Sequence, residues 1–309
     1  MRPLKLAVPD MISNSYFPAI AAIELGCFAA EGLDVALELI FPVDKAYAAL
    51  RDGAVDLVGG SAHSALAAFP EWQGVKLLCA QAQGMYWFLV MHKDLGASRG
   101  EIASVKGRRI GAAPWVEMGL RALLGAAGID PGRDSVTIAP VAGAQVGSIN
   151  FGVTAAEALA ARKIDGFWAN GMGAEVAVRQ GVGTIVLDVR RGDGPKPCFN
   201  YTMASLAATD RLIQSSPELA PAAIRAIARA HAALRGDLAL ASKIGRKLFP
   251  AFEAGLIAEL IARDLPYYDT AISESFVRGM NAFARQAGIL HGDVPYAQIV
   301  APQLATALE

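Results

Sequence analysis

Five segments of the sequence place small polar or aromatic side chains where a predicted strand gives way to a helix. In one of them, VDLVGGSAHSALAAF (residues 55–69), an apolar run ends at Gly60 and is followed by Ser61 and His63. Glycine lets a ligand approach the backbone, and the first N–H groups of a helix are unpaired and carry a partial positive charge. We interpret this junction as a ligand cradle, with a tight turn and a helix cap as the structural alternative.

The other four segments offer hydrogen-bonding groups and ring faces: PDMISNSYFP (9–18), AAPWVEM (112–118), AGAQVGSINFG (142–152) and WANGMG (168–173). Their candidate ligand-binding residues are Asp10, Ser13, Asn14, Tyr16, Phe17, Trp115, Glu117, Gln145, Asn150, Trp168 and Asn170. Tyr86 and Asn200 lie in two strand-like runs and are added to this set. Each has a simpler alternative, such as a helix cap for Ser13, a first-turn charge for Glu117 or core packing for the rings.

The composition of these segments indicates which chemical class of ligand fits best. None of the five contains Arg or Lys, whereas aromatic residues are frequent in them. An aromatic or heterocyclic solute with polar substituents therefore fits better than a small inorganic anion. An anionic group could still be held by backbone N–H groups at helix starts, or by Arg190, Arg191 and Lys196 farther along the chain.

Motifs of common enzyme classes are missing. GMGAEV and GVGTIV lack the third glycine of a dinucleotide site, and no phosphate-binding loop, H-E-x-x-H or G-x-S-x-G pattern occurs. Cys27, Cys79 and Cys198 are far apart in apolar surroundings, so we predict buried free thiols and neither a metal site nor a cofactor. Asp10 and Glu117 could form a carboxylate pair across a cleft, but solvated surface charges are the alternative, and we assign no catalytic residue.

Charge and hydropathy exclude further classes. The formal net charge is −1 and there are no basic blocks, which gives no electrostatic support for nucleic-acid binding. No apolar stretch reaches the roughly 18 residues that a membrane helix needs. The start, MRPLKLAVPD, lacks the apolar core of a secretory signal peptide. We therefore expect either a cytoplasmic chain or one from which a leader has been removed.

The elements that must position these residues repeat in order. Strands are predicted at Leu4–Val8, after Leu33 and before Gly60, with a helix from Phe17 to Gly32 and a shorter one ending at Gly53. The same strand–helix alternation returns over residues 106–170. We expect two similar α/β halves, with a first lobe of residues 1–86 plus 202–309 and a second lobe of residues 87–201.

Several segments, taken together, carry a family resemblance. These are AAIELGCFAAEGLDVAL, ALRDGAVDLVGGSAHSAL, VKLLCA, VKGRRIGA, LLGAAGIDPGRDSVTI, EALAARKIDGFWA and FVRGMNAFARQAGIL. In this order they cover nearly the whole chain, which resembles the type II periplasmic binding proteins of the SsuA/THI5-like (NMT1-like) family. One departure is that His63, His92, His231 and His291 are scattered and no cysteine-rich motif is present, which argues against the pyrimidine-synthase chemistry found on this fold.

The resemblance implies a fold and a function. The expected fold is α/β with two lobes, each a mainly parallel sheet flanked by helices, joined by two crossing strands. The expected function is that of a monomeric, periplasmic substrate-binding protein of an ABC importer, which captures a small organic solute of aromatic, heterocyclic, sulfonate or carboxylate type by hinge closure and delivers it to a permease. A cytoplasmic enzyme on the same fold and a sensor domain remain as alternatives.

Overall fold

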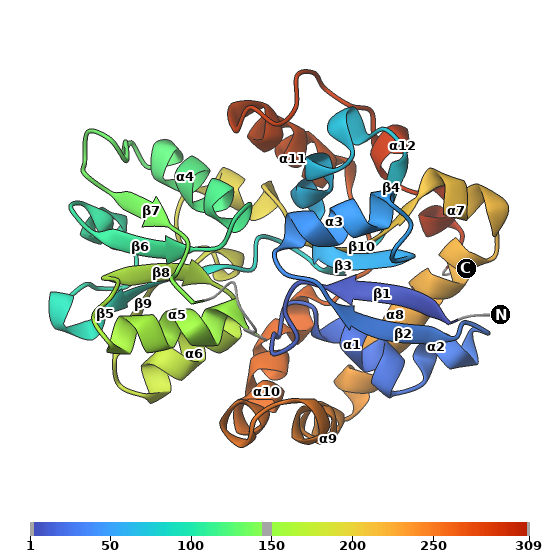
Figure 1. The fold of residues 1–309 in the computed structure, drawn as a ribbon, viewed down its shortest axis with the longest axis horizontal. Helices are drawn as coiled ribbons and strands as arrows, with labels where there is room; N and C mark the ends of the chain where they lie inside the picture. The colour runs from blue at the N-terminus through green and yellow to red at the C-terminus, as the bar shows by residue number, and fades with distance from the viewer. Residues whose placement is uncertain (1–2, 144–149, 308–309) are drawn as a thin grey trace.

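The chain forms two five-stranded sheets, each flanked by helices, in the computed structural model, which describes residues 3–143 and 150–307 (Figure 1). The first sheet has the order β2-β1-β3-β10-β4. Its strands are β1 (Leu4–Val8), β2 (Val35–Leu39), β3 (Leu57–Ser61), β4 (Val75–Ala82) and β10 (Ala204–Thr209). Only β10 runs antiparallel to its two neighbours. We call this sheet and the helices on it the first lobe.

The second sheet repeats this layout with the order β7-β6-β8-β5-β9. Its strands are β5 (Phe88–His92), β6 (Arg109–Ala112), β7 (Thr137–Ala139), β8 (Gly166–Ala169) and β9 (Gly183–Asp188). Here β5 is the antiparallel strand, paired with β8 and β9. We call this sheet and its helices the second lobe. The expected fold class, two mainly parallel sheets flanked by helices, is confirmed.

Equivalent aspartates mark the internal repeat. Asp56 precedes β3, and its carboxylate accepts the backbone N–H of Lys5 in β1 at 2.8 Å. Asp165 precedes β8 and in the same way accepts the backbone N–H of Arg109 in β6 at 2.8 Å. The similarity between residues 50–60 and 159–170 of the sequence therefore corresponds to the same local structure in both lobes.

Two segments cross between the lobes, and neither is a strand where it crosses. Residues 83–87 lead from β4 to β5, and residues 189–203 lead from β9 to β10. The second crossing contains two 3₁₀ helices, Val189–Arg191 and Lys196–Asn200. The antiparallel strand of each sheet begins directly after a crossing, at Phe88 and Ala204. The boundaries at residues 86/87 and 201/202 stay predictions.

The helices cover both faces of each sheet (Figure 1). Up to the second crossing they are α1 (Phe17–Glu24), α2 (Cys27–Ala30), α3 (Val43–Arg51), α4 (Val116–Ala126), α5 (Phe151–Ala160) and α6 (Gly171–Arg179). The remaining ones are α7 (Asp210–Ser215), α8 (Leu219–Gly236), α9 (Ala239–Leu248), α10 (Ala251–Asp264), α11 (Glu274–Gln286) and α12 (Tyr296–Ile299). Helices α4–α6 belong to the second lobe, and α10 packs against both α9 and α6.

Two of the predicted helices differ from those in the structure. The helix expected from Phe17 to Gly32 is broken into α1 and α2 by Gly26, whose φ of +70° is a left-handed conformation that glycine adopts without strain. The helix expected after Ser61 is a six-residue 3₁₀ helix, Ala62–Ala67. The first N–H of this turn, that of Ala62, donates to the Met203 carbonyl at 2.9 Å, so it is not free for a ligand.

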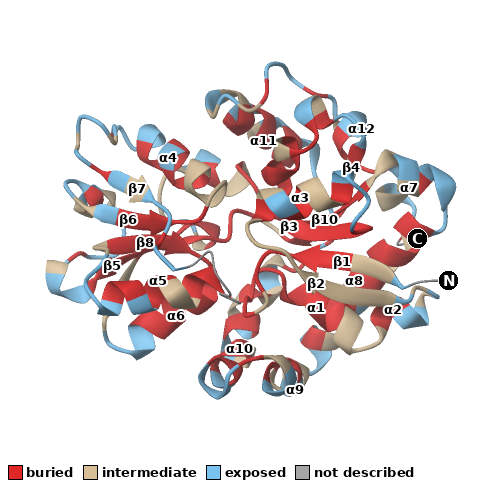
Figure 2. Cartoon of the chain, in the orientation of Figure 1, coloured by how far each residue is buried: buried red, intermediate tan, exposed pale blue. Residues whose placement is uncertain are grey.

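Burial is greatest in the strands that lie inside each sheet (Figure 2). All residues of β3, β5 and β8 are buried, because helices cover both faces of the sheets. Among the described residues, no helix is both long and apolar enough to cross a membrane. The ends of these buried strands point toward the space between the lobes, where the polar residues of the loops gather.

Candidate ligand site

A small cavity of about 40 Å³ lies between the two lobes, so a ring-sized ligand can enter it only when the lobes move apart. Its walls are formed by Pro9, Asp10, Tyr16, Phe41, Val43, Tyr86, Trp87, Ala113, Pro114, Val116, Phe151, Ala169 and Asn170. The first lobe contributes the residues up to Val43, the first crossing contributes Tyr86 and Trp87, and the second lobe contributes the rest. A small molecule held here would contact both lobes and the segment that joins them.

Strand ends determine which side chains line the cavity. Pro9 and Asp10 directly follow β1, Ala113 and Pro114 follow β6, and Asn170 follows β8. These strands are parallel within their sheets, so their carboxyl ends meet at one edge, which is where ligands bind in open α/β sheets. The two such edges face each other across the cavity.

A hydrogen bond between the lobes joins Asp10 and Asn170. The Asn170 side chain caps α6, since its Oδ1 accepts the Gly173 N–H at 3.1 Å, and this orients its Nδ2 toward Asp10. Nδ2 donates to Asp10 Oδ2 at 2.6 Å. Asp10 Oδ1 is buried and has no hydrogen-bond partner of normal geometry among the described residues.

Burial also determines the acid–base behaviour of Asp10. Loss of solvent raises the pKa of its carboxyl well above the usual range, although the nearby donors of Asn150 and the Ile12 backbone and the hydrogen bond from Asn170 oppose this shift. The empty cavity therefore holds a poorly solvated carboxyl group with one unused acceptor oxygen. Such a group favours a ligand that brings its own hydrogen-bond donor.

Two tyrosines form the next part of the wall. The hydroxyls of Tyr16 and Tyr86 are 2.8 Å apart, and their rings meet edge to face with centroids 5.9 Å apart. Burial raises the pKa of both phenols, so both are neutral near pH 7. The Arg190 guanidinium lies over the Tyr86 ring, 5.7 Å from its centroid, and pairs with the buried carboxylate of Asp264 at 3.1 Å.

Aromatic rings form the apolar walls. Phe41 from the first lobe and Phe151 from the second stack with centroids 6.3 Å apart and planes 16° apart. Trp87 lines the cavity and packs edge to face on Trp168, with centroids 6.1 Å apart. Trp168 itself is fully buried behind Trp87 and does not reach the cavity.

His63 connects the lobes at a second point. It lies after β3, and its Nδ1 is 3.0 Å from Thr202 Oγ1, while its Nε2 is 3.1 Å from the Trp115 carbonyl of the second lobe. Because a carbonyl only accepts, Nε2 carries the proton and Nδ1 accepts from the threonine. Burial lowers the pKa of His63 to about 4, so the ring is neutral at pH 7.

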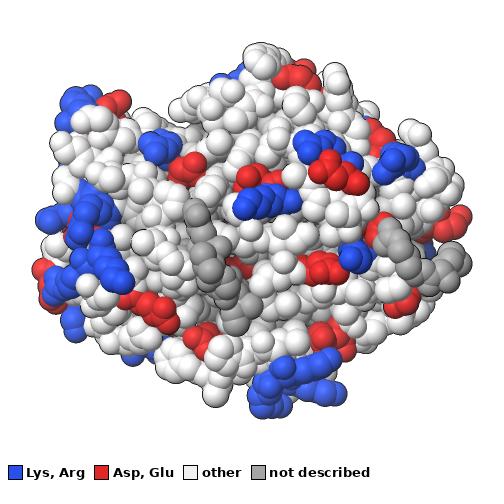
Figure 3. All heavy atoms as spheres, viewed as in Figure 1, with Lys and Arg blue, Asp and Glu red and all other residues white. Residues whose placement is uncertain are grey.

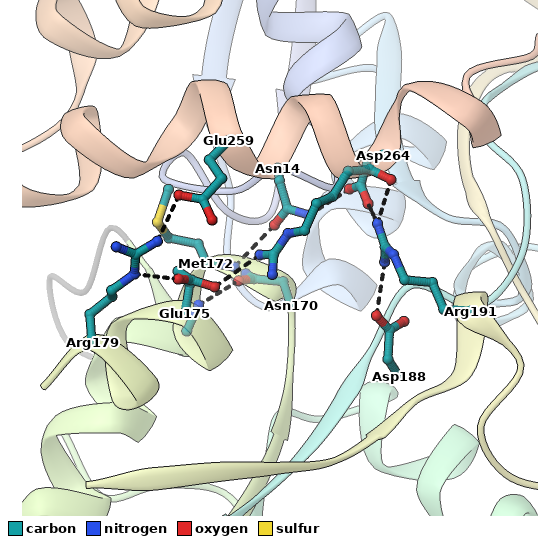
Figure 4. A network of polar contacts seen from close by, with 11 residues as sticks. Asn14, Asn170, Met172, Glu175, Arg179, Asp188, Arg191, Glu259 and Asp264 are labelled. Carbon is teal, nitrogen blue, oxygen red and sulfur yellow. Dashed lines mark hydrogen bonds and ion pairs between the residues drawn. The ribbon is translucent and has the colours of Figure 1, made fainter. Parts of the chain in front are cut away.

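A polar network joins the lobes below the cavity (Figure 4). Asn14 accepts the Met172 N–H of α6 at 3.1 Å and donates to Asp264 at the end of α10 at 2.7 Å. On the rim, Arg179 of α6 pairs with Glu259 of α10 at 2.7 Å (Figure 4). The lobes are thus held together in a closed arrangement by the chain's own side chains.

The predicted residues are distributed unevenly around the cavity. Asp10, Tyr16, Tyr86 and Asn170 line it. Asn150 lies just behind, where it caps α5 by accepting the Val153 N–H at 2.8 Å and donates to the Ile12 carbonyl. Gln145 lies outside the described residues.

The remaining predicted residues have other partners. Ser13 Oγ accepts the Ser15 N–H at 3.1 Å within its own loop, and the Ser61 hydroxyl is 2.6 Å from that of Ser64. Phe17 is a core residue beside Phe249, and Asn200 packs against Gly279 of α11. These side chains support the loops rather than line the cavity.

Three further predictions concern positions near the cavity. A Cβ on Gly60 would meet Val43 and Tyr47 at 3.1–3.2 Å. Glycine is therefore needed here because core side chains of the first lobe pack closely against its backbone. Trp115 packs against that core and meets His63 through its carbonyl. Glu117 is half-buried outside the cavity lining, and burial raises the pKa of its carboxyl.

Residues that the sequence reasoning did not select include Phe41, Val43, Ala113 and Ala169. The first two follow β2, so the rule of strand ends applied to that strand as well would have found them. The two alanines carry no distinctive side chain, and their part in the wall depends on packing across the lobes.

The described side chains that line the cavity do not favour metal binding or thiol chemistry. The described residues contain no group of three or more His, Cys, Asp or Glu side chains placed to hold a metal ion. The three cysteines are buried and unpaired, and they lie outside the cavity lining. Burial raises the pKa of each thiol, which disfavours the reactive thiolate.

The face of the molecule drawn in Figure 3 carries its charges in separate groups. On the face drawn there, Lys and Arg gather at the outer edge of the second lobe with acidic residues among them, and smaller mixed groups lie elsewhere. This distribution agrees with the net charge of −1. It differs from the continuous basic surface that nucleic-acid binding requires.

Solved structures share this architecture along almost the whole chain. A Bordetella bronchiseptica protein aligns with a TM-score of 0.78 and 22% identity, covering 99% of this chain and 97% of its own. The alkanesulfonate-binding protein SsuA from Xanthomonas axonopodis pv. citri, bound to MOPS, gives 0.70 and 15%, with 97% of each chain covered. The desulfurization enzyme DSZB, bound to biphenyl-2-sulfinic acid, gives 0.66 and 15%, with 99% of each covered.

Sequence comparison gives a more specific result. A search of curated proteins finds no match. A comparison with protein families matches residues 13–237, more than two thirds of the chain, to the family described as NMT1/THI5 like. The matched region begins in the loop after β1 and includes both crossings and the whole second lobe. This chain therefore belongs to the NMT1/THI5-like family.

Proposed function

We propose that this chain is the solute-binding component of an ABC importer and that it holds a small organic solute, with an aromatic or heterocyclic ring, in the cavity between its lobes. The observation that carries the proposal is the composition of the cavity wall, to which both lobes and the first crossing contribute. A ligand that contacts both lobes stabilises the closed arrangement relative to an open one, and this difference drives hinge closure.

The cavity walls support a ring-containing ligand. Trp87, Phe41 and Phe151 present ring faces or edges, and Asp10 and Asn170 supply polar atoms beside them. A dissociation constant near 1 μM corresponds to about −8 kcal/mol, which one stacked ring and several hydrogen bonds can supply.

The partner and location follow from the same proposal. The permease would recognise the closed pair of lobes, and the protein would work as a monomer in the periplasm. One solved structure supports this direction. The alkanesulfonate-binding protein SsuA from Xanthomonas axonopodis pv. citri is bound to MOPS, and its fold matches this one with a TM-score of 0.70. The lobe limits of 1–86 plus 202–309 and 87–201 belong to the proposal as well.

Catalysis on this fold is the competing function, because the desulfurization enzyme DSZB has the same architecture. In the present cavity the titratable groups among the described lining residues are Asp10, Tyr16 and Tyr86. The raised pKa of Asp10 would suit a general acid, so turnover must be measured and not only binding.

Binding and turnover are separated by one experiment. Compounds that raise the melting temperature in a thermal-shift screen are titrated by calorimetry and then recovered from the protein for mass spectrometry. We expect saturable binding of one molecule per chain and recovery of the unaltered compound. A product in the recovered fraction would favour the enzyme, and no saturable binding of any compound would contradict the proposal.

A matched pair of variants tests whether the ligand binds in this cavity. Trp87→Leu removes a ring from the cavity wall, whereas Trp72→Leu removes a buried ring from the core of the first lobe. Both should lower the melting temperature of the empty protein, since replacing a buried aromatic by a smaller side chain costs about 2–5 kcal/mol. Only Trp87→Leu should abolish the ligand-induced shift, and equal binding by both variants would place the ligand elsewhere.

A further inference from the structure

The polar atoms of the cavity are not matched to an anion. Among the described residues that line it, Asp10 is the one with an ionisable carboxyl, and none is Lys, Arg or His. The buried Arg190 lies over the Tyr86 ring, 5.7 Å from its centroid, and is not among the residues that line the cavity. It pairs with Asp264 at 3.1 Å, while its Nε and Nη2 have no hydrogen-bond partner among the described residues. An anionic solute would therefore be buried here without a cation in the described lining, whether Asp10 is ionised or protonated. A cation beside Asp10 would instead favour the ionised carboxylate and form a neutral pair with it.

The hydrogen-bonding groups of the cavity also favour a ligand that donates a hydrogen bond. Asn170 has both ends of its amide engaged, with Oδ1 on the Gly173 N–H and Nδ2 on Asp10 Oδ2. Asp10 Oδ1 is the acceptor that remains, on a side chain that is 6% exposed. A buried polar atom without a partner costs stability, and a ligand that supplies the partner regains it.

We propose that the cavity selects an uncharged or cationic solute whose apolar ring carries an N–H or O–H donor, that Asp10 Oδ1 accepts this hydrogen bond, and that carboxylates and sulfonates are excluded. The inference rests on the proposed solute-binding function and gives its ligand a chemical class. It departs from the sulfonate and carboxylate solutes expected from the sequence, and it makes Asp10 the residue that determines specificity.

Probes that share one ring and differ in charge test this directly. Benzamidine is cationic with N–H donors, benzamide is neutral with both a donor and an acceptor, and benzoate and benzenesulfonate are anionic. The naphthyl equivalents repeat the series on a larger ring. Each is titrated into the full chain at pH 7.5 by calorimetry, and we expect the amidines to bind at least about tenfold more tightly than the anions, since a hydrogen bond to a charged group is worth that much.

The variant Asp10→Asn replaces the unpartnered acceptor Oδ1 with a hydrogen-bond donor. Its amide oxygen can still accept from Asn170, which leaves an NH₂ donor at the position of Oδ1. We expect amidine binding to weaken at least about tenfold, while benzoate binding stays the same or strengthens. Asp52→Asn removes the same charge from an exposed site at the end of α3, and it should leave every affinity unchanged.

Each result of these titrations either supports or overturns the inference about the ligand's charge. Tighter binding of anions than of amidines, or amidine binding that survives Asp10→Asn, would overturn the inference, as would a complete lack of binding by the amidines and amides. Anion binding that is lost in Trp87→Leu would overturn this inference while leaving the proposed solute-binding function intact. A failure of the proposed function would instead appear as no saturable ligand in the broader screen.

Discussion

The imidazole of His63, on the first lobe, donates to the main-chain carbonyl of Trp115, on the second lobe, at 3.1 Å. Trp115 has a φ of +68°, a conformation that few residues other than glycine adopt, and its carbonyl is thereby presented to the histidine. The contact joins the loop after β3 to the loop after β6. In the internal repeat β8 is equivalent to β3 and β6 to β1, so the contact joins non-equivalent loops of the two halves when the lobes meet.

This contact predicts a pH dependence of folding stability. The pKa of His63 is about 4 in the folded protein, below the value of about 6.5 that it has when unfolded, so the unfolded chain binds the proton more tightly. Stability should therefore be complete above about pH 6.5 and should fall as the pH drops toward 4. Urea unfolding of the parent and of His63→Gln at pH 7 and pH 4.5 measures the effect, and the variant should lose less stability on acidification.

A second histidine provides the control. His231 Nε2 contacts the Gln81 carbonyl at 2.8 Å within the first lobe, and burial also lowers its pKa to about 4. His231→Gln should reduce the acid sensitivity in the same way but leave ligand affinity unchanged. His63→Gln should weaken ligand binding as well, because it loosens a contact between the lobes. Equal ligand affinities in the two variants would show that the His63 contact has no part in closure.

The effect of Asp10 on the pH dependence of stability should be opposite to that of His63. Burial raises its pKa in the folded protein, so the folded state binds the proton more tightly, and ionisation of Asp10 lowers stability as the pH rises through that raised pKa. Asp10→Asn, which cannot ionise, should therefore raise the melting temperature of the empty protein at pH 8 relative to the parent, with a smaller difference at pH 4. A melting temperature that falls at pH 8 would mean that the ionised carboxylate stabilises the cavity.

The buried ion pair at the second crossing should matter far more than the one on the rim. Asp264 binds Arg190, Arg191 and Asn14, and both Asp264 and Arg190 are almost fully buried. Asp264→Asn leaves Arg190 without its counter-ion and should cost about 3–5 kcal/mol of unfolding free energy. Glu259→Gln, which breaks the exposed pair with Arg179, should cost no more than about 1 kcal/mol. Similar costs in urea unfolding would contradict the burial of the first pair.

Two glycines in helices give a matched test of packing. A Cβ on Gly173 of α6 would lie 2.6 Å from the Gly152 backbone of α5, whereas a Cβ on Gly255 of α10 would meet nothing within 4 Å. Gly255→Ala should stabilise the protein by about 0.5–1 kcal/mol through helix propensity. Gly173→Ala should destabilise it and also weaken ligand binding, because it displaces the start of α6, where Asn170 is held. Unfolding curves and calorimetric titrations of both variants decide this.

The order of the strands could be predicted from the sequence because the patterns that specify them are local. Leu4–Val8 and the run that ends at Gly60 are short apolar segments followed by a proline or glycines, and both are strands in the structure. The turn after Ser61 could not be predicted in the same way. Its alanines favour an α-helix, but Ala62 donates to Met203, which lies about 140 residues away and arrives by the second crossing.

Burial limited what could be predicted about the candidate site. The sequence predicts Trp168 in a loop that lines the cavity, but the residue lies within β8. This strand is covered on both faces, so the ring is enclosed behind Trp87. Asp10 and Asn170 could be selected because polar residues at strand ends are unusual for a core. Their hydrogen bond could not be predicted, since it joins residues from different lobes and depends on how the lobes meet.

The distance across the cleft, measured with and without ligand, tests the central claim most directly. Spin labels on Lys45→Cys in α3 and Arg121→Cys in α4 occupy exposed positions on helices that begin at the facing strand ends of the two lobes. Electron–electron double resonance should give a longer or broader distance distribution for the empty protein and a shorter, narrower one after the tightest-binding amidine is added. An identical distribution in both states, with the compound bound, would contradict the proposal that the lobes close around a solute.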